Sequence, residues 1–273
     1  MIRSLYSGVS GMKNHQIRMD VIGNNIANVN TVGFKSARCN FQDLLNQSLR
    51  SPVGGDGTTG GVNPSQVGLG VTVAGIANNM GQGALQSTGR TLDLAIEGNG
   101  YFMIKKDSGD ADDEAFFTRE GSFYLDNNGD LVNSNGYYLC DDAGAIIHVS
   151  DQPETISSLT ISNTGEIVVT DSAGTNTYQI GLGTFPNDTG LTKAGQNLYQ
   201  ASAASGPVTM NIAGTADTGV ANSTINSCYL EMSNVDLTDE FANLITTQRG
   251  YQANARTITT SDQMLQELLN IKQ

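Results

Sequence analysis

The chain has 273 residues and a formal net charge of −13 at pH 7, and it is long enough for one large or two modest domains. The negative charge argues against nucleic acids and anionic membrane surfaces as partners. No stretch reaches the about 18 apolar residues of a membrane span. The N-terminus lacks the apolar run of a cleaved secretory signal. We therefore expect no nucleic-acid binding, no membrane insertion and no cleaved signal.

Residues 1–30 are predicted to form a helix with one apolar face. The apolar residues recur at steps of three, four and seven, which is helical spacing. They are Ile2, Leu5, Val9, Met12, Met19, Ile22, Ile26 and Val29. Beside them runs a row of small residues, Ser4, Gly8 and Gly11, which would let a second backbone come close. Each glycine costs about 1 kcal/mol relative to alanine inside a helix, so we expect a helix that forms only when it is packed.

Residues 31–66 are predicted to be an extended connection. Residues 47–66 alone contain five glycines and two prolines, a composition typical of a linker. Residues 55–60 match the letters of the dinucleotide-binding pattern GxGxxG. They follow a proline rather than a strand, and no helix follows them, so we expect no nucleotide site there.

Residues 67–233 are predicted to form a β-rich antiparallel domain. Short segments with strand-like alternation are separated by turns rich in asparagine, glycine and aspartate, typical of a sandwich or barrel. The expected strands lie within residues 67–76, 91–105, 116–139, 145–149, 159–161, 166–170, 177–184, 198–200 and 227–232.

Residues 234–273 are predicted to form a second long helix that pairs with the first. Asp236 is the expected N-cap, and Asp239 and Glu240 add negative charge to the first turn. An apolar seam recurs at steps of three and four, as in a coiled coil. The seam consists of Phe241, Leu244, Gln248, Tyr251, Ala255, Ile258, Asp262, Leu265 and Leu269. The alternative is an ordinary amphipathic helix on a globular core.

The predicted fold class is therefore α+β. The two terminal segments, residues 1–30 and 234–273, would pair as a coiled-coil-like inner domain. Residues 67–233 would form a β-rich outer domain, and residues 31–66 would connect the two. Such a design indicates a structural protein with its assembly contacts at the termini.

The sequence shows no catalytic, cofactor or metal site. Asp126, Asn128 and Asp130 have the opening spacing of a calcium loop, but the glycine and glutamate that such a loop needs are missing, so a turn is expected. His15 and His148 lie near no serine or cysteine motif, and we interpret both as hydrogen-bonded structural residues.

Three cysteines, Cys39, Cys140 and Cys228, are far apart in the sequence and form no CxxC motif. We interpret them as thiols rather than as a disulfide framework, and a crosslink between subunits stays open.

Four segments resemble signature blocks of the axial proteins of the bacterial flagellum, the family of rod and hook subunits. They are DVIGNNIANVNTVGFK (Asp20–Lys35), STGRTLDLAIEGNGYFMI (Ser87–Ile104), TGLTKAGQNLY (Thr189–Tyr199) and the stretch Glu231–Ile271. The terminal signature positions are Asn24, Asn25, Ala27, Asn28, Gly33, Phe34, Ser233, Asn234 and Val235.

The resemblance implies a non-enzymatic, self-assembling subunit of the flagellar basal body or hook. Residues 67–76 and 232–241 resemble hook subunits most, especially the compact ones of Gram-positive-type bacteria, whereas the chain length is close to that of a distal rod subunit. The first expectation is therefore a flexible hook subunit, and the alternative is a distal rod subunit. A secreted adhesin would be a different class, but only 6% of the residues are aromatic, too few to favour an exposed aromatic cleft.

The resemblance also implies the partners and the route of assembly. Subunits would leave the cell unfolded through the flagellar type III export apparatus and would add to the growing tip beneath a cap protein. The apolar faces of the two terminal helices would carry the contacts with other copies. Further partners would be other axial proteins of the rod and of the hook–filament junction.

Overall fold

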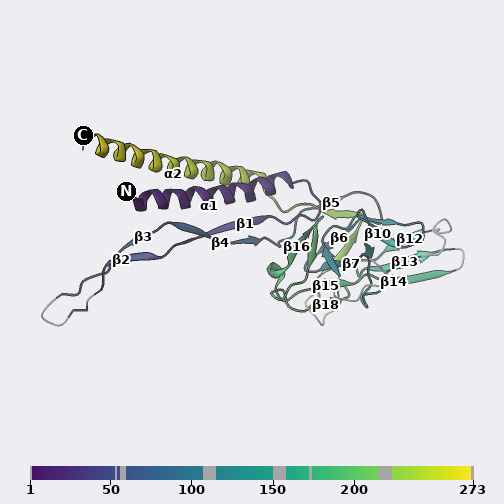
Figure 1. Ribbon diagram of the computed structural model, residues 1–273. Helices are drawn as coiled ribbons and strands as arrows, with labels where there is room; N and C mark the ends of the chain where they lie inside the picture. Colours follow the sequence, from purple (N-terminus) through teal and green to yellow (C-terminus); the bar gives the residue numbers. More distant parts are fainter. Residues whose placement is uncertain are drawn as a thin grey trace. The chain divides into compact units, whose positions relative to one another are not determined.

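The computed structural model describes residues 2–52, 54–55, 60–106, 115–149, 158–171, 174–214 and 223–271 (Figure 1). It consists of two compact units. The helix–arm unit contains residues 1–27, 37–78 and 236–273, and the β unit contains residues 28–36 and 79–235. The chain therefore passes between the units four times, after residues 27, 36, 78 and 235.

Two long helices form the helical part of the helix–arm unit. Helix α1 covers Ile2–Ala27, and helix α2 covers Leu237–Ile271. The backbone N–H of Thr238 donates to the Asp236 carboxylate over 2.8 Å, which confirms Asp236 as the N-cap of α2. Neither helix is long and apolar enough, within the described residues, to cross a membrane.

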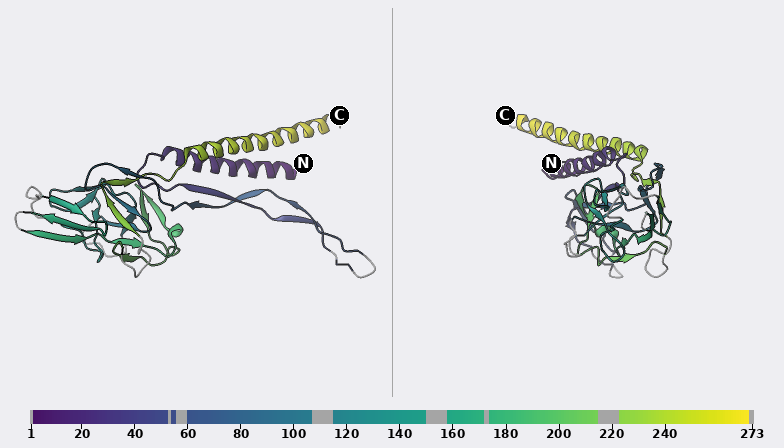
Figure 2. Two further views of the ribbon diagram at one scale, coloured as in Figure 1. Left: turned by 180° about the vertical axis from the view of Figure 1, so that it is seen from behind. Right: turned by 90° about the vertical axis from the view of Figure 1, so that its right-hand side faces the viewer.

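A long antiparallel hairpin, the arm, accompanies the helices in this unit. Strand β1 (Ala37–Asp43) pairs with β4 (Val71–Asn78), and β2 (Asn46–Arg50) pairs with β3 (Ser65–Gly68). Helix α1 lies between α2 and the β1–β4 part of the arm in both side views (Figures 1 and 2). The Asn14 amide donates to the Val71 carbonyl over 2.6 Å and ties α1 to the arm. A two-stranded hairpin is marginal by itself, so this contact with α1 helps to hold it.

The arm includes most of the segment that we predicted as an extended connection, residues 31–66. The backbone there is extended, but β1 and β2 give it hydrogen-bonded partners in β4 and β3. Residues 56–59 of the GxGxxG match lie outside the described residues. The predicted domain boundaries stay a prediction.

The β unit contains sixteen described strands. Their bounds are β5 Leu85–Ser87, β6 Leu94–Glu97, β7 Tyr101–Lys105, β8 Phe116–Thr118, β9 Phe123–Leu125, β10 Leu131–Asn133, β11 Tyr138–Leu139, β12 Ser158–Ile161, β13 Glu166–Thr170, β14 Thr175–Gln179, β15 Leu182–Thr184, β16 Thr192–Gly195, β17 Leu198–Gln200, β18 Thr209–Asn211, β19 Thr224–Ser227 and β20 Tyr229–Glu231. A 3₁₀ helix covers Asp188–Gly190.

All the strand pairs among the described residues are antiparallel. The largest sheet has the order β16-β17-β8-β7-β11-β10-β9, and β15 joins it by pairing with β7 and β18. Strands β12, β13 and β14 form a three-stranded sheet, and the pairs β6–β19 and β5–β20 stand apart. Together with the terminal helices, this arrangement confirms the predicted α+β class and its antiparallel β-rich middle.

The core of the β unit lies among these strands. Phe102 and Phe123 are fully buried and meet edge to face, with ring centroids 5.4 Å apart. Ile104, Leu139 and Leu182 belong to the same buried cluster. This apolar interior explains why the alternating segments form strands despite their short length.

One predicted strand, residues 145–149, is not a strand in the structure. Only isolated bridges form there, between Ile146 and Cys140 and between His148 and Asp130. The Asp141 carboxylate accepts the backbone N–H groups of residues 143 and 145 and closes a tight turn, so the backbone there is diverted from a ladder.

The calcium-like segment is a turn, as predicted. The N–H of Gly129 donates to the carbonyl of Asp126 over 3.0 Å, and the N–H of Asp126 donates to the carbonyl of Asp130 over 2.9 Å. Within the described residues, no group of three or more potential ligands among His, Cys, Asp and Glu is placed to hold a metal ion.

Candidate functional site: the helix pair and the chain crossings

Small residues form the closest part of the contact between α1 and α2. A methyl group added at Gly8 would lie 2.9 Å from Oγ1 of Thr257, and one at Gly11 would lie 2.6 Å from Nδ2 of Asn254. Both separations are shorter than van der Waals contact allows. The predicted close approach at Gly8 and Gly11 is therefore confirmed, and α2 is the partner.

Polar side chains continue the same line of contact towards both ends. The hydroxyls of Ser4 and Ser261 lie 3.4 Å apart, and Nη2 of Arg18 donates to Oδ1 of Asn243 over 3.2 Å. Residue numbers rise along one helix as they fall along the other, so the pair is antiparallel. The helices pair as predicted, but this line of contact is small and polar rather than the large apolar seam.

His15 lies where the two helices and the arm meet. Its ring packs edge to face on Phe41 of β1, with centroids 5.6 Å apart, and its Nε2 faces Gly250 of α2. Its Nδ1 is buried and has no hydrogen-bond partner among the described residues. Our expectation of a fully hydrogen-bonded histidine was wrong here, because the space is filled by apolar contact. Burial, with a smaller effect from Arg18, lowers the pKa of His15.

The signature residue Asn25 joins three elements at the end of α1. Its side-chain amide donates to the carbonyl of Ala37 and to the carboxylate of Glu240, both over 2.8 Å, and its oxygen accepts the N–H of Ala37 over 3.0 Å. The side chain thus binds the start of β1 and the start of α2. Its neighbours Asn24 and Ala27 are exposed.

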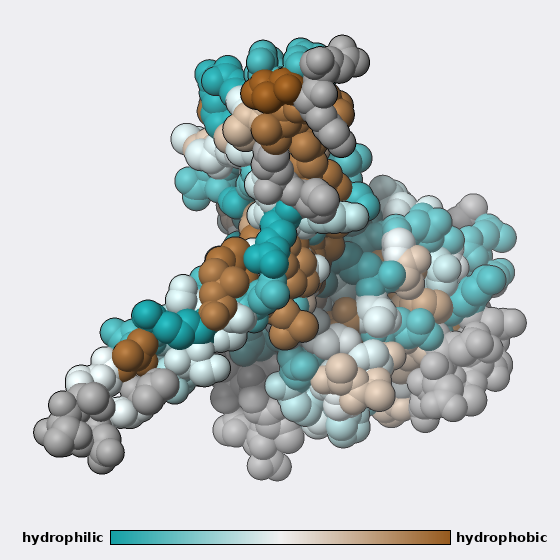
Figure 3. Space-filling view, turned by 60° about the vertical axis from the view of Figure 1, so that its left-hand side comes forward, coloured by the Kyte–Doolittle hydropathy of each residue, from teal (hydrophilic) through white to brown (hydrophobic). Residues whose placement is uncertain are grey.

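Large apolar side chains remain exposed on α2. Phe241 is 51%, Tyr251 37% and Leu269 68% exposed, and Leu244, Ile258 and Leu265 are half-buried. The predicted seam therefore leaves much of its apolar surface open within this chain. Further exposed residues, which fall outside the three–four steps of the seam, are Ile245, Met264, Leu268 and Ile271. Apolar surface of this kind is visible on the helical part in Figure 3.

The predicted apolar face of α1 is more covered. Ile22 is buried, and Val9 is exposed. The half-buried members are Leu5, Met12, Met19 and Ile26, and Val29 is half-buried just after the helix. Ile2 is the first residue of α1, and its side chain lies outside the description.

A buried ion cluster lies in the β unit, next to the chain crossings. Nζ of Lys35 is 2.5 Å from Oε1 of Glu231, and Nη1 of Arg119 is 3.3 Å from Oε2 of Glu231. The Lys35 and Glu231 side chains are fully buried, and that of Arg119 is 4% exposed. Burial lowers the pKa of Lys35, and the charge of Glu231 opposes that shift.

The remaining signature residues surround this cluster. Gly33 has φ +69°, and its N–H donates to the Glu231 carbonyl over 2.8 Å. Phe34 is buried beneath Nζ of Lys193, which is 5.0 Å from the ring centre. The signature positions Asn28, Ser233, Asn234 and Val235 belong to the same connecting segments. Sequence reasoning missed Lys35, Arg119 and Glu231, although Lys35 and Glu231 stand at the edges of two signature blocks.

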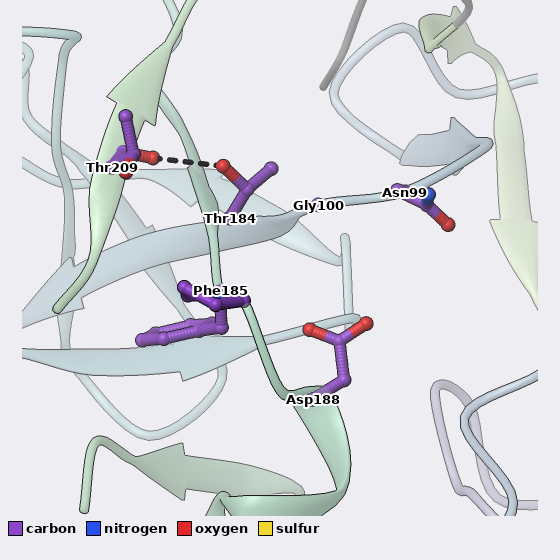
Figure 4. A pocket seen from close by; sticks show the side chains of 7 residues that line it. Asn99, Gly100, Thr184, Phe185, Asp188 and Thr209 are labelled. Carbon is purple, nitrogen blue, oxygen red and sulfur yellow. Dashed lines mark hydrogen bonds between the residues drawn. The ribbon is translucent and has the colours of Figure 1, made fainter. Parts of the chain in front are cut away.

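A pocket of about 280 Å³ opens beside the 3₁₀ helix of the β unit (Figure 4). Its lining consists of Asn99, Gly100, Thr184, Phe185, Pro186, Asp188 and Thr209. The Thr184 hydroxyl donates to the Thr209 carbonyl over 3.2 Å. Burial raises the pKa of Asp188, against the opposing charge of Arg119. The lining residues include neither histidine nor cysteine.

Within the described part of the chain, none of the three cysteines is assigned to a disulfide. Cys39 and Cys140 are buried, and Cys228 is half-buried. Burial raises the pKa of the Cys39 thiol, which disfavours the reactive thiolate.

Three family descriptions match separate parts of the chain. Residues 5–35 match "Flagella basal body rod protein", and residues 95–169 match "Flagellar hook protein FlgE/F/G D1 domain". Residues 226–271 match "Flagellar basal body rod FlgEFG protein C-terminal". The first and third of these contain the two terminal helices almost entirely.

Curated relatives include both rod and hook proteins. The flagellar basal-body rod protein FlgG of Bacillus subtilis is 48% identical over 275 residues, which cover 100% of each chain. The flagellar hook protein FlgE of Borreliella burgdorferi is 28% identical over an alignment of 450 residues, with 100% of each chain covered. The hook protein FlgE of Treponema pallidum is 56% identical over 137 residues, which are 50% of this chain and 28% of that protein.

Terminal helices that pair with each other, a β-rich middle part of the sequence and apolar surface left open on the helices together define a structural protein that assembles with other copies. The chain belongs to the family of flagellar rod and hook proteins. These axial proteins of the flagellar basal body and hook polymerise with copies of themselves and with other axial proteins.

Proposed function

We propose that this chain is the distal rod subunit of the flagellar basal body. The observation that carries the proposal is its match over the full length of a basal-body rod protein, at 48% identity and nearly equal length. Of the two hook proteins above, that of Treponema pallidum matches 50% of this chain. That of Borreliella burgdorferi needs an alignment of 450 positions, far more than the 273 residues of this chain. The sequence alone favoured a hook subunit, and this comparison supports the alternative.

We propose that the exposed apolar residues of the two helices form contacts between copies. Phe241, Tyr251 and Leu269 leave on α2 a surface that water solvates poorly. Burying such a side chain contributes about 1.5–3 kcal/mol relative to leaving it exposed. Contacts of this kind that repeat head to tail without closing produce a helical tube.

The route of assembly is part of the same proposal. The subunit would pass unfolded through the flagellar type III export apparatus and would add at the tip beneath a cap protein. Gly8 and Gly11 weaken α1 as an isolated helix, so the segment reaches a stable helical state only after packing. Other rod proteins and hook proteins would be its neighbours along the axis.

Complementation tests the choice between rod and hook. The chain is expressed in two Bacillus subtilis strains, one without its own basal-body rod protein FlgG and one without its hook protein. The proposal predicts rods that carry hooks in the first strain and no hooks in the second. Restored hooks in the second strain, with no rods in the first, would contradict it.

A matched pair of variants tests the assembly surface. Leu269→Asp places a charge on a side chain that is 68% exposed, so the chain itself should fold normally. Asn270→Asp makes the same change of charge on the neighbouring exposed residue. The purified L269D chain should fail to polymerise under conditions in which the N270D chain polymerises. Equal polymer yield from both chains would refute the proposed surface.

A further inference from the structure

The β unit is closed by a segment from near the end of the chain. Strand β6 pairs with β19, and strand β5 pairs with β20, and neither β5 nor β6 has another strand partner among the described residues. Residues 223–235 therefore supply the strand partners of β5 and β6. The chain leaves the β unit directly after this segment and enters α2.

We propose that residues 33–36 and 231–234 form one latch, which opens and closes as a single element. The consequence is that the segment leaving α1 and the segment entering α2 are held or released together. The proposal goes beyond the assignment to the rod, because it concerns the free chain and does not depend on the partner in the flagellum.

Three hydrogen-bonded contacts join the two halves of the latch directly. The N–H of Gly33 donates to the carbonyl of Glu231 over 2.8 Å, and Nζ of Lys35 binds the Glu231 carboxylate. The N–H of Ser36 donates to Oδ1 of Asn234 over 2.8 Å. Each half therefore supplies partners that the backbone or side chains of the other half need.

The side chain of Asn234 adds a third crossing of the chain to the latch. Its amide donates to the carbonyls of Asn79 and Gly81 over 2.8 and 3.0 Å. The N–H of Asn79 donates to the carbonyl of Ser36 over 2.7 Å. Ser36, Asn79 and Asn234 thus form a closed ring of contacts where three of the four crossings leave the β unit.

The buried charges explain why the halves should not open separately. Two cations, Lys35 and Arg119, share the carboxylate of Glu231, and all three side chains are at least 96% buried. The Lys35 ammonium also donates to the carbonyl of Gly81, and the N–H of Gly83 donates to Glu231. If residues 231–234 left alone, both cations would stay buried without a counter-charge, which is strongly unfavourable.

Packing leaves little room for a partial opening. A methyl group at Gly83 would lie 2.0 Å from the carbonyl oxygen of Met232, so the two backbones are in direct contact.

One set of contacts acts against the proposal. Nζ of Lys193 donates to the carbonyl of Lys35, and the amide of Asn197 donates to the carbonyl of Val32, both over 3.0 Å. These contacts connect residues 32 and 35 to the β16–β17 hairpin without involving residues 231–234.

Hydrogen exchange of the full chain shows whether residues 33–36 and 231–234 open together or separately. Mass spectrometry follows peptides that cover residues 28–36, peptides that cover residues 229–235, and a reference peptide in β13. In the unmodified chain, the two halves of the latch should show the same free energy of opening. Glu231→Gln removes the counter-charge and should speed exchange in both halves by the same factor, on the order of tenfold or more. Exchange in β13 should not change.

Two further variants keep the test decisive. Glu166→Gln removes an exposed carboxylate on β13 and should leave exchange in the latch unchanged. Asn234→Ala is a milder change than Glu231→Gln and replaces it in the test if the Glu231→Gln chain does not fold. It should also raise the rate of hydrogen exchange equally in both halves of the latch. Faster exchange in residues 229–235 alone would overturn the proposal, since the hairpin contacts would then suffice for residues 33–36. An equal increase in β13 would also overturn it, because the cluster would then act on the whole unit.

Discussion

The glycines of α1 give a test of the helix pair. The position of each glycine alone decides whether its replacement by alanine raises or lowers the stability of the chain. Replacing glycine by alanine inside a helix stabilises it by about 1 kcal/mol through helix propensity. At Gly23 an added methyl group would meet no atom within 4 Å, so Gly23→Ala should gain the full amount. At Gly8 the methyl would lie 2.9 Å from Oγ1 of Thr257 and 3.2 Å from Cγ1 of Ile258. Both neighbours are β-branched and therefore stiff at χ1.

Overpacking of this kind costs about 1–3 kcal/mol, so Gly8→Ala should be neutral or destabilising by up to about 2 kcal/mol overall. The two variants should then differ by about 1–3 kcal/mol. Urea unfolding followed by circular dichroism at 222 nm measures the difference, with both chains at equal concentration. If Gly8→Ala stabilises the helices as much as Gly23→Ala does, α1 and α2 do not pack at Gly8 as described.

Three further predictions each concern a single residue: His15, Asn25 and Cys228. The pKa of His15 is lower in the folded chain than its ordinary value, so its contribution to stability is complete above the unfolded pKa of about 6.5 and is lost as the pH falls below it. The stability of the helix pair, measured by urea unfolding between pH 7 and pH 5, should fall more for the natural chain than for His15→Gln, and parallel profiles would contradict this. Asn25→Ala should cost about 1–3 kcal/mol in the same assay because it leaves buried polar groups of β1 and α2 unpaired. Asn40→Ala, at an exposed position of β1, should change little. In the native chain, Cys228 should react with a thiol reagent well before the two buried thiols, and simultaneous reaction of all three would refute the burial pattern.

The terminal helices were predictable because their patterns are long and periodic. The predicted residues 1–30 and 234–273 contain α1 and α2 with only a few residues to spare. The line of contact was missed because small and polar residues give no hydropathy signal. A signal did exist, since Thr247, Asn254 and Ser261 recur every seven residues along α2, and Thr247 and Ser261 are its buried positions.

The latch could not be predicted from local pattern. Lys35 and Glu231 are 196 positions apart, and Arg119 is 112 positions from Glu231, so only the folded chain brings them together. The short strands β5 and β19 were missed for a similar reason, since each gains its order from a strand far away in the sequence.

The choice between rod and hook could not be made from signatures that both kinds of subunit share. The residues around Asn25, Gly33 and Asn234 serve contacts within one chain, at the end of α1 and at the chain crossings. Such contacts lie within one subunit and do not involve a neighbouring copy. They therefore indicate the family more strongly than the place of a subunit along the flagellar axis.

The shape of the polymer tests most directly whether the chain is a distal rod subunit. The purified chain is driven to polymerise by salt and high protein concentration and is imaged by electron microscopy. A distal rod subunit should form straight, stiff tubes. Curved, supercoiled tubes would contradict the assignment to the rod and return the chain to the hook, and failure to form any polymer would contradict the proposed assembly itself.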